Sequence, residues 1–332
     1  MADTDFTLDR SNLRAEQYLA PETIGQIGNF EIRARMIAEG VMSGMHRSPY
    51  QGLAVEFAEH RQYVPGDDPK HIDWKVFGRS DKLYLKQYQQ ETNLDVVLLV
   101  DSSASMRYGT LAVKSGWGGT QATNRMSSWT KFDHATATAA AMAYLCLQQR
   151  DRVGVNVFAD GVCSQLKRSN ARDTWRSLVR TLSTETVDQP TDLGKTTDQV
   201  LANITNRSLF VLISDLLMPP ETVQASLARF RHRRHDVILC QVLDRQELRF
   251  ELEDPAPFDG LEGEARITVD PRSIRDEYLA AMQQHCDSME TTARSLGFDY
   301  IRMDSHESVG PPLAALFGRR LALGRGGKGM GT

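Results

Sequence analysis

The sequence predicts an α/β protein in which helices cover both faces of a doubly wound, mostly parallel sheet of the Rossmann-like kind. Three runs of mainly aliphatic residues, at 96–100, 208–213 and 237–242, lack polar alternation and are typical of strands buried on both faces. Between these runs lie segments whose apolar residues recur at helical spacing. Strands that alternate with helices in this way favour a parallel sheet.

The remaining elements fill the intervals between the buried strands. Alternating valines at 153–157 predict a short strand, and the Asp160-Gly161 turn predicts an antiparallel return. Pro220 and Pro271 each predict the first turn of a helix, where proline is tolerated. In chain order we expect a helix at 130–149, strands at 153–157 and 162–166, helices at 175–182 and 193–204, a helix from 220, a helix at 270–296, a strand at 298–303 and a helix at 311–316.

Regions outside this alternation define the expected domains. Residues 94–320 form the α/β domain, preceded by a small β-containing extension at 51–93 and by a helical or irregular segment at 1–50. Residues 321–332, rich in glycine, are expected to be a disordered tail. Within the domain, residues 106–128 are rich in Gly, Ser, Thr and Asn and predict a long loop.

The composition is that of a globular protein. Of its 332 residues, 41% are hydrophobic and 25% are charged, and a net charge of −4 gives no general attraction to nucleic acid. The longest apolar runs are well short of the roughly 20 residues that span a bilayer, and residues 1–5 lack the order of a signal peptide. We therefore expect a cytoplasmic protein without membrane insertion or a nucleic-acid partner. Its dispersed cysteines should be reduced and mostly buried.

Oxygen-bearing side chains follow the first buried strand. Asp101, Ser103 and Ser105 alternate along the turn that leaves the sheet, so they could converge on one ion. A carboxylate with two hydroxyls suits Mg²⁺ or Mn²⁺ better than zinc. Because parallel strands end at one edge of a sheet, Asp215 and Thr191 are candidates for the remaining ligands. Plain capping of the turn by Asp101, and of the next helix by Thr191, are the alternatives.

These residues carry a resemblance to known proteins. The Asp-x-Ser-x-Ser turn with a later Thr and Asp resembles the metal-ion-dependent adhesion site of von Willebrand factor A-type domains. A longer pattern resembles the bacterial family known as domain of unknown function family fifty-eight, over about residues 50–320. It comprises segment 56–68 (EFAEHRQYVPGDD), segment 71–75 (HIDWK), segment 83–92 (LYLKQYQQET), segment 131–135 (KFDHA) and Gly154.

The resemblance implies a von Willebrand factor A-type domain that holds a metal through Asp101, Ser103, Ser105, Thr191 and Asp215. In such sites the serines bind the ion directly and the acids act largely through water, so the ion can accept a carboxylate from a partner protein. Members of the family are often encoded beside MoxR-type AAA+ ATPases. The resemblance therefore implies a non-catalytic adaptor that works with such an ATPase in protein or complex maturation and leaves room for a further client protein.

An enzyme is the alternative hypothesis. A metal-dependent phosphoryl-transfer or hydrolytic enzyme would use Asp101 as its nucleophile, but Ser103 stands where D-x-D-x-T phosphatases have a second acid. The sequence contains neither a G-x-S-x-G nucleophile elbow nor a P-loop. The basic run at 229–235 is typical of a solvated helix end, although it could contact an acidic partner. We assign no catalytic residue.

Overall fold

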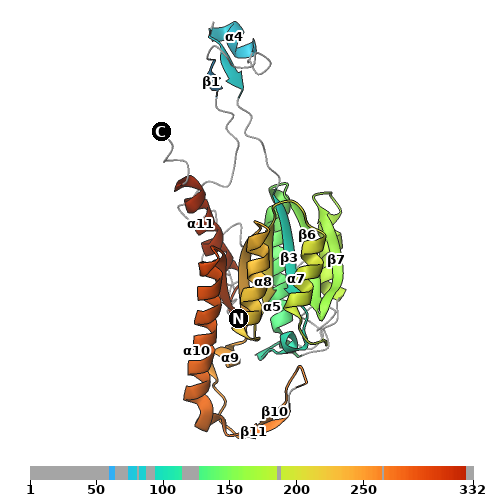
Figure 1. Cartoon of the computed structure of the whole chain (residues 1–332), viewed down its shortest axis with the longest axis vertical. Helices are drawn as coiled ribbons and strands as arrows, with labels where there is room; N and C mark the ends of the chain where they lie inside the picture. Colours follow the sequence, from blue (N-terminus) through green and yellow to red (C-terminus); the bar gives the residue numbers. More distant parts are fainter. Residues whose placement is uncertain are drawn as a thin grey trace, which may run out of the picture. The chain divides into compact units, whose positions relative to one another are not determined.

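Figure 1 shows a computed structural model that describes residues 60–63, 74–80, 82–86, 94–113, 127–184, 188–263 and 265–326. The chain divides into two compact units, of which one is Pro49–Asn93 and the other contains Leu94–Thr332. The N-terminal segment expected at 1–50 lies outside the described residues, as does most of the family pattern at 56–75.

The smaller unit contains a two-stranded antiparallel ribbon. Strand β1 (His60–Gln62) pairs with β2 (Tyr84–Lys86), and Arg61 lies opposite Leu85. Helix α4 (Trp74–Ser80) lies between them in the chain. The ring of Trp74 is 62% exposed and meets Phe77 edge-on at 6.1 Å. The smaller unit therefore contains one short β-ribbon and one short helix in its described residues.

The larger unit is built on a six-stranded sheet in the order β12–β9–β8–β3–β6–β7. Every neighbouring pair is parallel except β6 and β7. The strand order reverses beside β3, and open sheets of this kind bind ligands at such a switch point. The predicted doubly wound, mostly parallel fold class is confirmed. The strands are β3 (Asp95–Asp101), β6 (Arg152–Ala159), β7 (Gly161–Ser169), β8 (Leu209–Ser214), β9 (Asp236–Leu243) and β12 (Asp299–Asp304).

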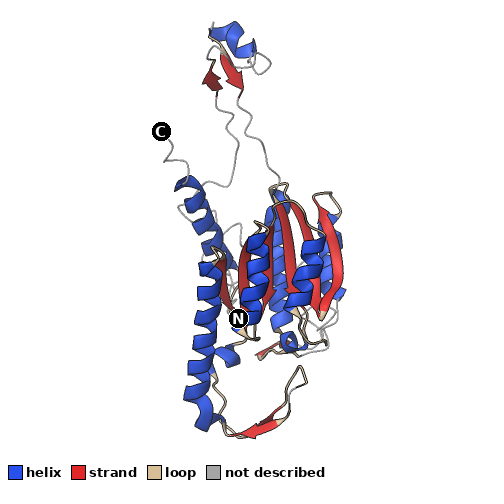
Figure 2. Ribbon diagram, viewed as in Figure 1, coloured by secondary structure: helices blue, strands red, loops and turns tan. Residues whose placement is uncertain are grey.

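Helices cover both faces of this sheet (Figure 2). Residues Val97 and Leu99 of β3 pack in one apolar cluster, with α7 (Leu193–Ala202), α8 (Pro220–His232) and α10 (Pro271–Ser295). The alternate residues Val96, Leu98 and Val100 pack in a second cluster on the other face. That cluster contains residues of α5 (Lys131–Gln148), α6 (Thr174–Thr184) and α11 (Gly310–Gly326). Each fully buried aliphatic side chain stabilises the fold by about 1.5–3 kcal/mol. Because β3 contributes such side chains to both clusters, it is the centre of the core.

Local signals explain where the helices begin. Thr130 caps α5: its hydroxyl accepts a hydrogen bond from the amide of Asp133, whose carboxylate accepts one from the amide of Thr130. Such a reciprocal cap stabilises a helix by about 1 kcal/mol. Pro220 and Pro271 occupy first-turn positions in α8 and α10, as predicted. Gly154 of β6 is required by close packing, because a Cβ there would lie 2.9 Å from the carbonyl oxygen of Leu166.

Several short elements were not predicted. The segment expected as a long loop contains the 3₁₀ helix η2 (Ala104–Arg107) and the antiparallel pair β4 (Leu111–Ala112) and β5 (Ser128–Trp129). Between β9 and α10, where we predicted no element, lie α9 (Arg245–Arg249) and the hairpin of β10 (Ala256–Phe258) and β11 (Ile267–Val269). These pieces are too short to show a period. Helix α11 continues to Gly326, past residue 320, where we expected a tail without regular structure.

Two further expectations concern membranes and cysteines. Across the residues that the structure describes, no helix combines the length and apolar character needed to cross a bilayer. Cys146, Cys240 and Cys286 are buried free thiols, whereas Cys163 is exposed. The cysteines are therefore mostly buried, as predicted.

His134 gives the fold a predictable sensitivity to acid. It is 1% exposed in α5, and burial lowers the pKa of its imidazole from 6.5 to about 4. Below pH 6.5 the imidazole of His134 takes up a proton in the unfolded chain but stays neutral in the folded chain. The free energy of unfolding therefore decreases as the pH falls. Between pH 7.5 and 5, this one group should lower the free energy of unfolding by about 2 kcal/mol.

Urea denaturation of wild type and His134→Gln at the two pH values checks this expectation. The variant should lose less stability on acidification, by about the same 2 kcal/mol. Replacing the exposed His232 of α8 by Gln provides the matched control. Equal acid sensitivity in wild type and His134→Gln would show that the imidazole is not the cause.

Candidate metal centre

Asp101, the last residue of β3, is fully buried and held at both carboxylate oxygens. Oδ1 accepts a hydrogen bond from the amide of Ser103 at 2.8 Å, and Oδ2 accepts one from the hydroxyl of Ser214 at 2.6 Å. Burial, and next the negative charge of Asp215, raise the pKa of Asp101 to about 7. The capping role considered for Asp101 is thus present in the turn. In the described part of the chain Asp101 has no cationic partner, a role that a bound cation would fill.

The two serines of the turn lie together beside the Thr191 loop. The hydroxyl oxygens of Ser103 and Ser105 are 3.1 Å apart. Ser103 forms an isolated parallel bridge with Gln189, and the amide of Ala104 donates to the carbonyl of Gln189 at 2.8 Å. Because Gln189 is two residues before Thr191, this backbone pairing holds the Thr191 loop against the serine turn.

Thr191 and Ser105 both approach one oxygen of Glu262. The hydroxyl of Thr191 donates to Glu262 Oε1 at 3.5 Å, and the amide of Ser105 donates to the same atom at 3.4 Å. The capping alternative for Thr191 is wrong, because Asp192 is the cap of α7 and accepts from the amide of Lys195 at 2.8 Å. The hydroxyl of Thr191 is therefore not used to begin the helix.

Asp215 follows β8 and pairs with a buried lysine. Its Oδ2 accepts from Lys131 Nζ at 2.8 Å, and the same ammonium donates to Glu247 Oε1 at 2.6 Å. The side chain of Lys131 is only 1% exposed. Burial by itself would lower the pKa of Lys131, but the charges of Asp215 and Glu247 outweigh burial and raise this pKa above its usual value. Lys131 is therefore charged and neutralises one of the two acids.

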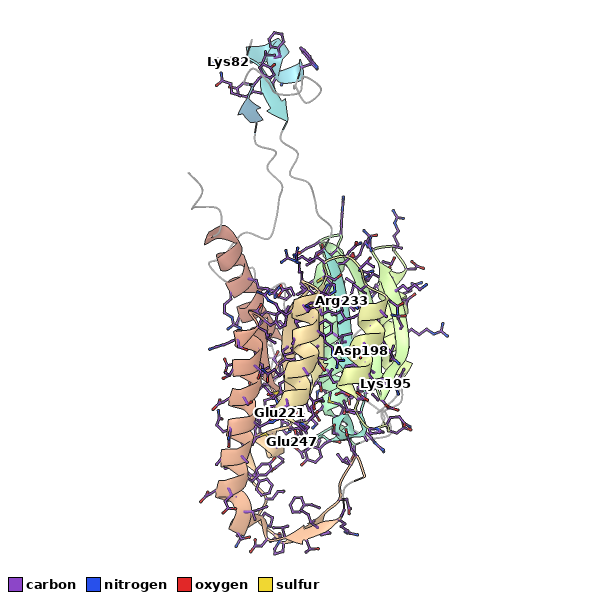
Figure 3. All side chains as sticks on the ribbon, in the orientation of Figure 1. Lys82, Lys195, Asp198, Glu221, Arg233 and Glu247 are labelled. Carbon is purple, nitrogen blue, oxygen red and sulfur yellow. The ribbon has the colours of Figure 1, made fainter. Side chains whose placement is uncertain are left out.

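Glu247, which is labelled in Figure 3, connects this ion pair to the ends of other strands. Its Oε2 accepts from the amide of Asp244, which caps α9 directly after β9. The buried carboxylate of Asp244 in turn accepts from the hydroxyl of Thr110 at 2.6 Å and from that of Ser305 at 2.9 Å. A continuous polar network thus joins Asp215 to the carboxyl ends of β9 and β12.

Four residues of this arrangement were not assigned to the site from sequence. Lys131 stands in the first turn of α5, where the helix dipole disfavours a cation, so its position was a signal that it is paired. Asp244 and Glu247 have the spacing of a capping box. For Glu262 the only signal was the nearby Asp259-Gly260 turn between two short strands.

The donor set fits a hard divalent cation. Across the described parts of the chain, no three His, Cys, Asp or Glu side chains are grouped so that they could hold a metal. The predicted set instead combines two acids with three hydroxyls. In the described residues Asp101 has no cationic partner. Carboxylate and hydroxyl oxygens suit Mg²⁺ or Mn²⁺, which keep some water ligands. The chemistry of these residues therefore fits such an ion.

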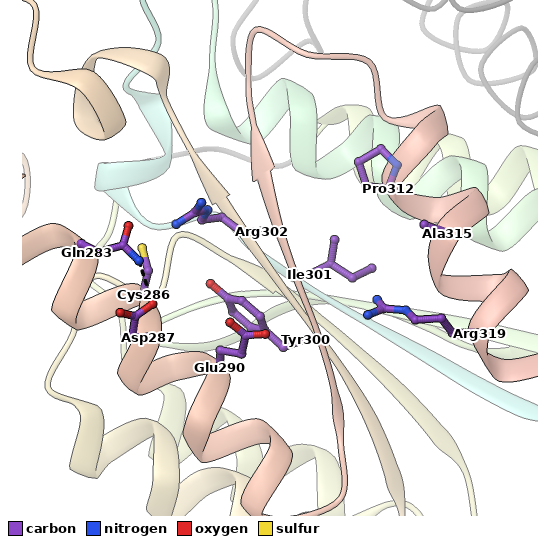
Figure 4. Close-up of a pocket in the computed structure, with 10 residues that line it drawn as sticks. All are labelled: Gln283, Cys286, Asp287, Glu290, Tyr300, Ile301, Arg302, Pro312, Ala315 and Arg319. Atoms are coloured by element: carbon purple, nitrogen blue, oxygen red, sulfur yellow. Dashed lines mark hydrogen bonds between the residues drawn. The ribbon is translucent and has the colours of Figure 1, made fainter. Parts of the chain in front are cut away.

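A separate groove of about 530 Å³ lies between α10, β12 and α11 (Figure 4). Asp287 and Glu290 line it from α10, and Arg302 and Arg319 line it from β12 and α11. Burial raises the pKa of the Cys286 thiol, so this cysteine is not an activated nucleophile. The mixed charge of the groove favours no single class of ligand.

Comparison with known proteins gives a family and several relatives. The sequence profile described as "Protein of unknown function DUF58" matches residues 59–288. Uncharacterized proteins of Mycobacterium tuberculosis and Mycobacterium bovis are 26% identical over 282 residues, which cover 83% of this chain and 83% of theirs.

Similar solved structures share little sequence with this chain. An aerotolerance-related membrane protein from Bacteroides fragilis, with multiple mutations to serines, is 17% identical and covers 69% of this chain and 99% of its own, with a TM-score of 0.42. BatB from Bacteroides thetaiotaomicron is 14% identical over 69% of this chain and 98% of its own, with a TM-score of 0.38. The SpRpn10 VWA domain is 10% identical and covers 67% of this chain and 94% of its own, with a TM-score of 0.38. The fold assignment rests on the strand order.

Replacing Lys131 by Met should destabilise the fold strongly. The change leaves Asp215 and Glu247 buried without their shared cation, and breaking a buried ion pair from one side costs about 3–5 kcal/mol. Urea denaturation at pH 7 measures the loss. The exposed Lys167 of β7 provides the matched control, since Lys167→Met should change stability by less than about 0.5 kcal/mol. A loss below about 1 kcal/mol for Lys131→Met would contradict this assignment.

Proposed function

The chain belongs to the DUF58 family, and on that premise we propose that it is a non-catalytic protein-interaction module. In this proposal Mg²⁺ or Mn²⁺ is held by Ser103, Ser105 and Thr191, with Asp101 and Asp215 acting largely through water. The observation that carries the proposal is the environment of Asp101, which is fully buried, close to the charge of Asp215 and, among the residues that the structure describes, without a cationic partner.

The chemistry of the ligands favours docking over catalysis. When bound, an ion held mainly by neutral hydroxyls keeps much of its positive charge and can attract an external carboxylate. Both oxygens of Asp101 already accept hydrogen bonds, and the Lys131 ammonium engages Asp215. The protein's carboxylates are thus restrained from neutralising the ion fully. An acidic side chain of a partner protein suits the remaining position.

The enzymatic alternative finds less support. A nucleophilic Asp101 would have to reach a substrate, but the residue is fully buried, and its two carboxylate oxygens accept hydrogen bonds from Ser103 and Ser214. Thr110, His306 and Asp244 form a nearby hydroxyl–imidazole–carboxylate cluster. There, His306 Nε2 lies 3.0 Å from the Thr110 hydroxyl and 3.3 Å from Asp244 Oδ2. A relay that activates a hydroxyl needs the acid on the opposite ring nitrogen. We therefore favour the interaction module.

For the partner we propose a MoxR-type AAA+ ATPase, with this chain as its adaptor in the maturation of a client protein or complex. The support is family membership together with a site whose chemistry suits an acidic side chain. The ATPase would supply the energy of nucleotide hydrolysis, and this chain would supply recognition.

Metal binding should raise the melting temperature. At a concentration about 100 times the dissociation constant, a ligand of the folded state adds about 2.7 kcal/mol, or roughly 5–10 °C for a domain of this size. Thermal scans with Mg²⁺ or Mn²⁺ and then with EDTA test this effect. Asp101→Ala and Ser103→Ala should lose the shift, whereas Thr291→Ala on the exposed face of α10 should retain it. A wild-type protein without any shift would argue against the metal.

Partner binding should depend on the same serine. With a purified MoxR-type AAA+ ATPase from the same organism, calorimetry in Mg²⁺ should show binding that EDTA abolishes. Ser103→Ala should weaken it by about tenfold or more, since losing a charged contact at an interface costs at least that. Thr291→Ala is again the control. Equal affinity for wild type and Ser103→Ala would place the interface elsewhere.

A further inference from the structure

The six-stranded sheet ends in two edge strands that differ in how they are protected. Strand β7 has register shifts against β6 and carries Lys167 and Arg168. Irregularities and basic side chains of this kind keep natural edges from pairing with other chains. Strand β12 pairs with β9 without interruption from Asp299 to Asp304. Among the described residues β9 is its only partner strand, so the far side of β12 is an open edge.

This open edge presents backbone groups that can form hydrogen bonds. The amide of Ser305, directly after β12, donates to the carbonyl of Leu243 in β9 at 2.9 Å. Because backbone N–H and C=O groups alternate in direction along a strand, the odd-numbered residues of β12 face β9, and Tyr300 and Arg302 face away. No hydrogen bond from a described residue reaches the outward backbone groups of Tyr300 and Arg302.

Ion pairs hold both ends of β12. Arg320 of α11 donates to Asp299 at 2.6 Å and also lies 2.9 Å from Asp236 of β9. At the other end, Arg245 of α9 donates to Asp304 at 3.0 Å. The strand is therefore fixed in place before anything binds beside it, and a preformed edge lowers the entropic cost of association.

Helices α10 and α11 border this edge and leave the groove of about 530 Å³ described above. In Figure 4, β12 runs between α10, which carries Asp287 and Glu290, and α11, which carries Ala315. The side chains of β12 alternate between the two helices. Tyr300 packs against the apolar cluster that contains α10, and Ile301 lies in the cluster that contains α11. A strand added beside β12 would direct its side chains alternately to the same two sides.

The wall formed by α10 is mainly acidic. Asp287 and Glu290 lie three residues apart and therefore on one side of the helix. Asp287 accepts a hydrogen bond from the neutral amide of Gln283 at 2.7 Å, and Glu290 pairs with the exposed Arg294 one turn further along. Arg302 of β12 contacts the same helix through its guanidinium group. Among the described residues Asp287 has no ion-pair partner, so a basic side chain of a bound segment can pair with it.

The wall formed by α11 is less polar. Pro312 and Ala315 line it, and the exposed Arg319 follows one turn later. The groove as a whole therefore carries both signs of charge and suits no simple ion. An extended peptide can match each wall separately, because successive side chains of a strand point to opposite faces.

We propose that β12 and this groove bind an extended segment of a partner protein, which adds to the sheet as a further strand. The backbone of the segment pairs with Tyr300 and Arg302. A Lys or Arg of the segment lies against Asp287, and its small apolar side chains lie against Pro312 and Ala315. The proposal does not depend on the metal, because β8 and β9 separate β12 from β3 in the sheet.

Panning of the full chain, in EDTA, against a phage-displayed library of random linear peptides tests the proposal. Peptides of about ten residues are long enough to cover the six residues of β12. The selected peptides should share alternating apolar and polar positions, with Lys or Arg among the polar ones. A selected peptide, labelled with fluorescein, should bind wild type equally well in EDTA and in Mg²⁺ by fluorescence anisotropy.

Two substitutions at Arg302 separate its backbone from its side chain. Proline removes the outward N–H of this residue without removing a hydrogen bond to β9, and edge strands tolerate proline in that orientation. Arg302→Pro should therefore weaken binding of the labelled peptide about tenfold. Arg302→Thr keeps the N–H and is the matched control, which should bind as wild type does. Asp287→Asn should weaken binding about threefold, as expected for an exposed ion pair.

A second measurement uses wild type alone and stays valid if the proline variant does not fold. Two versions of the peptide carry N-methyl groups on alternate backbone amides, in the two possible registers. Only the version methylated on the amides that face β12 should lose binding. Equal affinity of the two versions, or panning that selects no alternating peptide, would overturn the proposal. A wild-type dimer that Arg302→Pro converts to a monomer would overturn it in favour of a second copy of this chain.

Discussion

The buried ammonium group of Lys131 is the interaction on which the rest of the site depends. It lies between Asp215 and Glu247 with almost no exposure to water, and so ties the first turn of α5 to the ends of β8 and β9. One cation shared between two acids leaves a negative surplus, to which Asp101 adds when ionised. Ion pairs in such a place add little net stability. Their effect is to fix how much charge the sheet edge presents.

The register of β3 and β8 brings Asp101 and Ser214 to the same position at the edge of the sheet. β3 and β8 run parallel with Val100 opposite Ile213, so the next residues, Asp101 and Ser214, come together and form a 2.6 Å hydrogen bond. A slip of one residue would turn Asp101 to the opposite face of the sheet. The apolar residues of β3 fill both clusters, and this burial enforces the register. The position of the polar edge is thus a consequence of core packing.

The sequence revealed long elements better than short ones. The aliphatic runs that became β3, β8 and β9 were recognisable because buried parallel strands lack alternation. The residues after Val100 and Ile213 could be placed at the sheet edge by the same reasoning. Glu247 and Glu262 could not, because their elements are too short for a period. Glu262 also lies 157 residues from Ser105 in the chain, a distance that only the folded topology closes.

The central place of β3 has a mechanical consequence. A pulling force applied at Asp101 would load β3 along its own axis, with β6 on one side and β8 on the other. Parallel pairing on both sides places the inter-strand hydrogen bonds in shear, so they must fail together. Asp101 is thus attached to a strand that is hydrogen-bonded on both sides, so tension applied at this residue would be shared with β6 and β8.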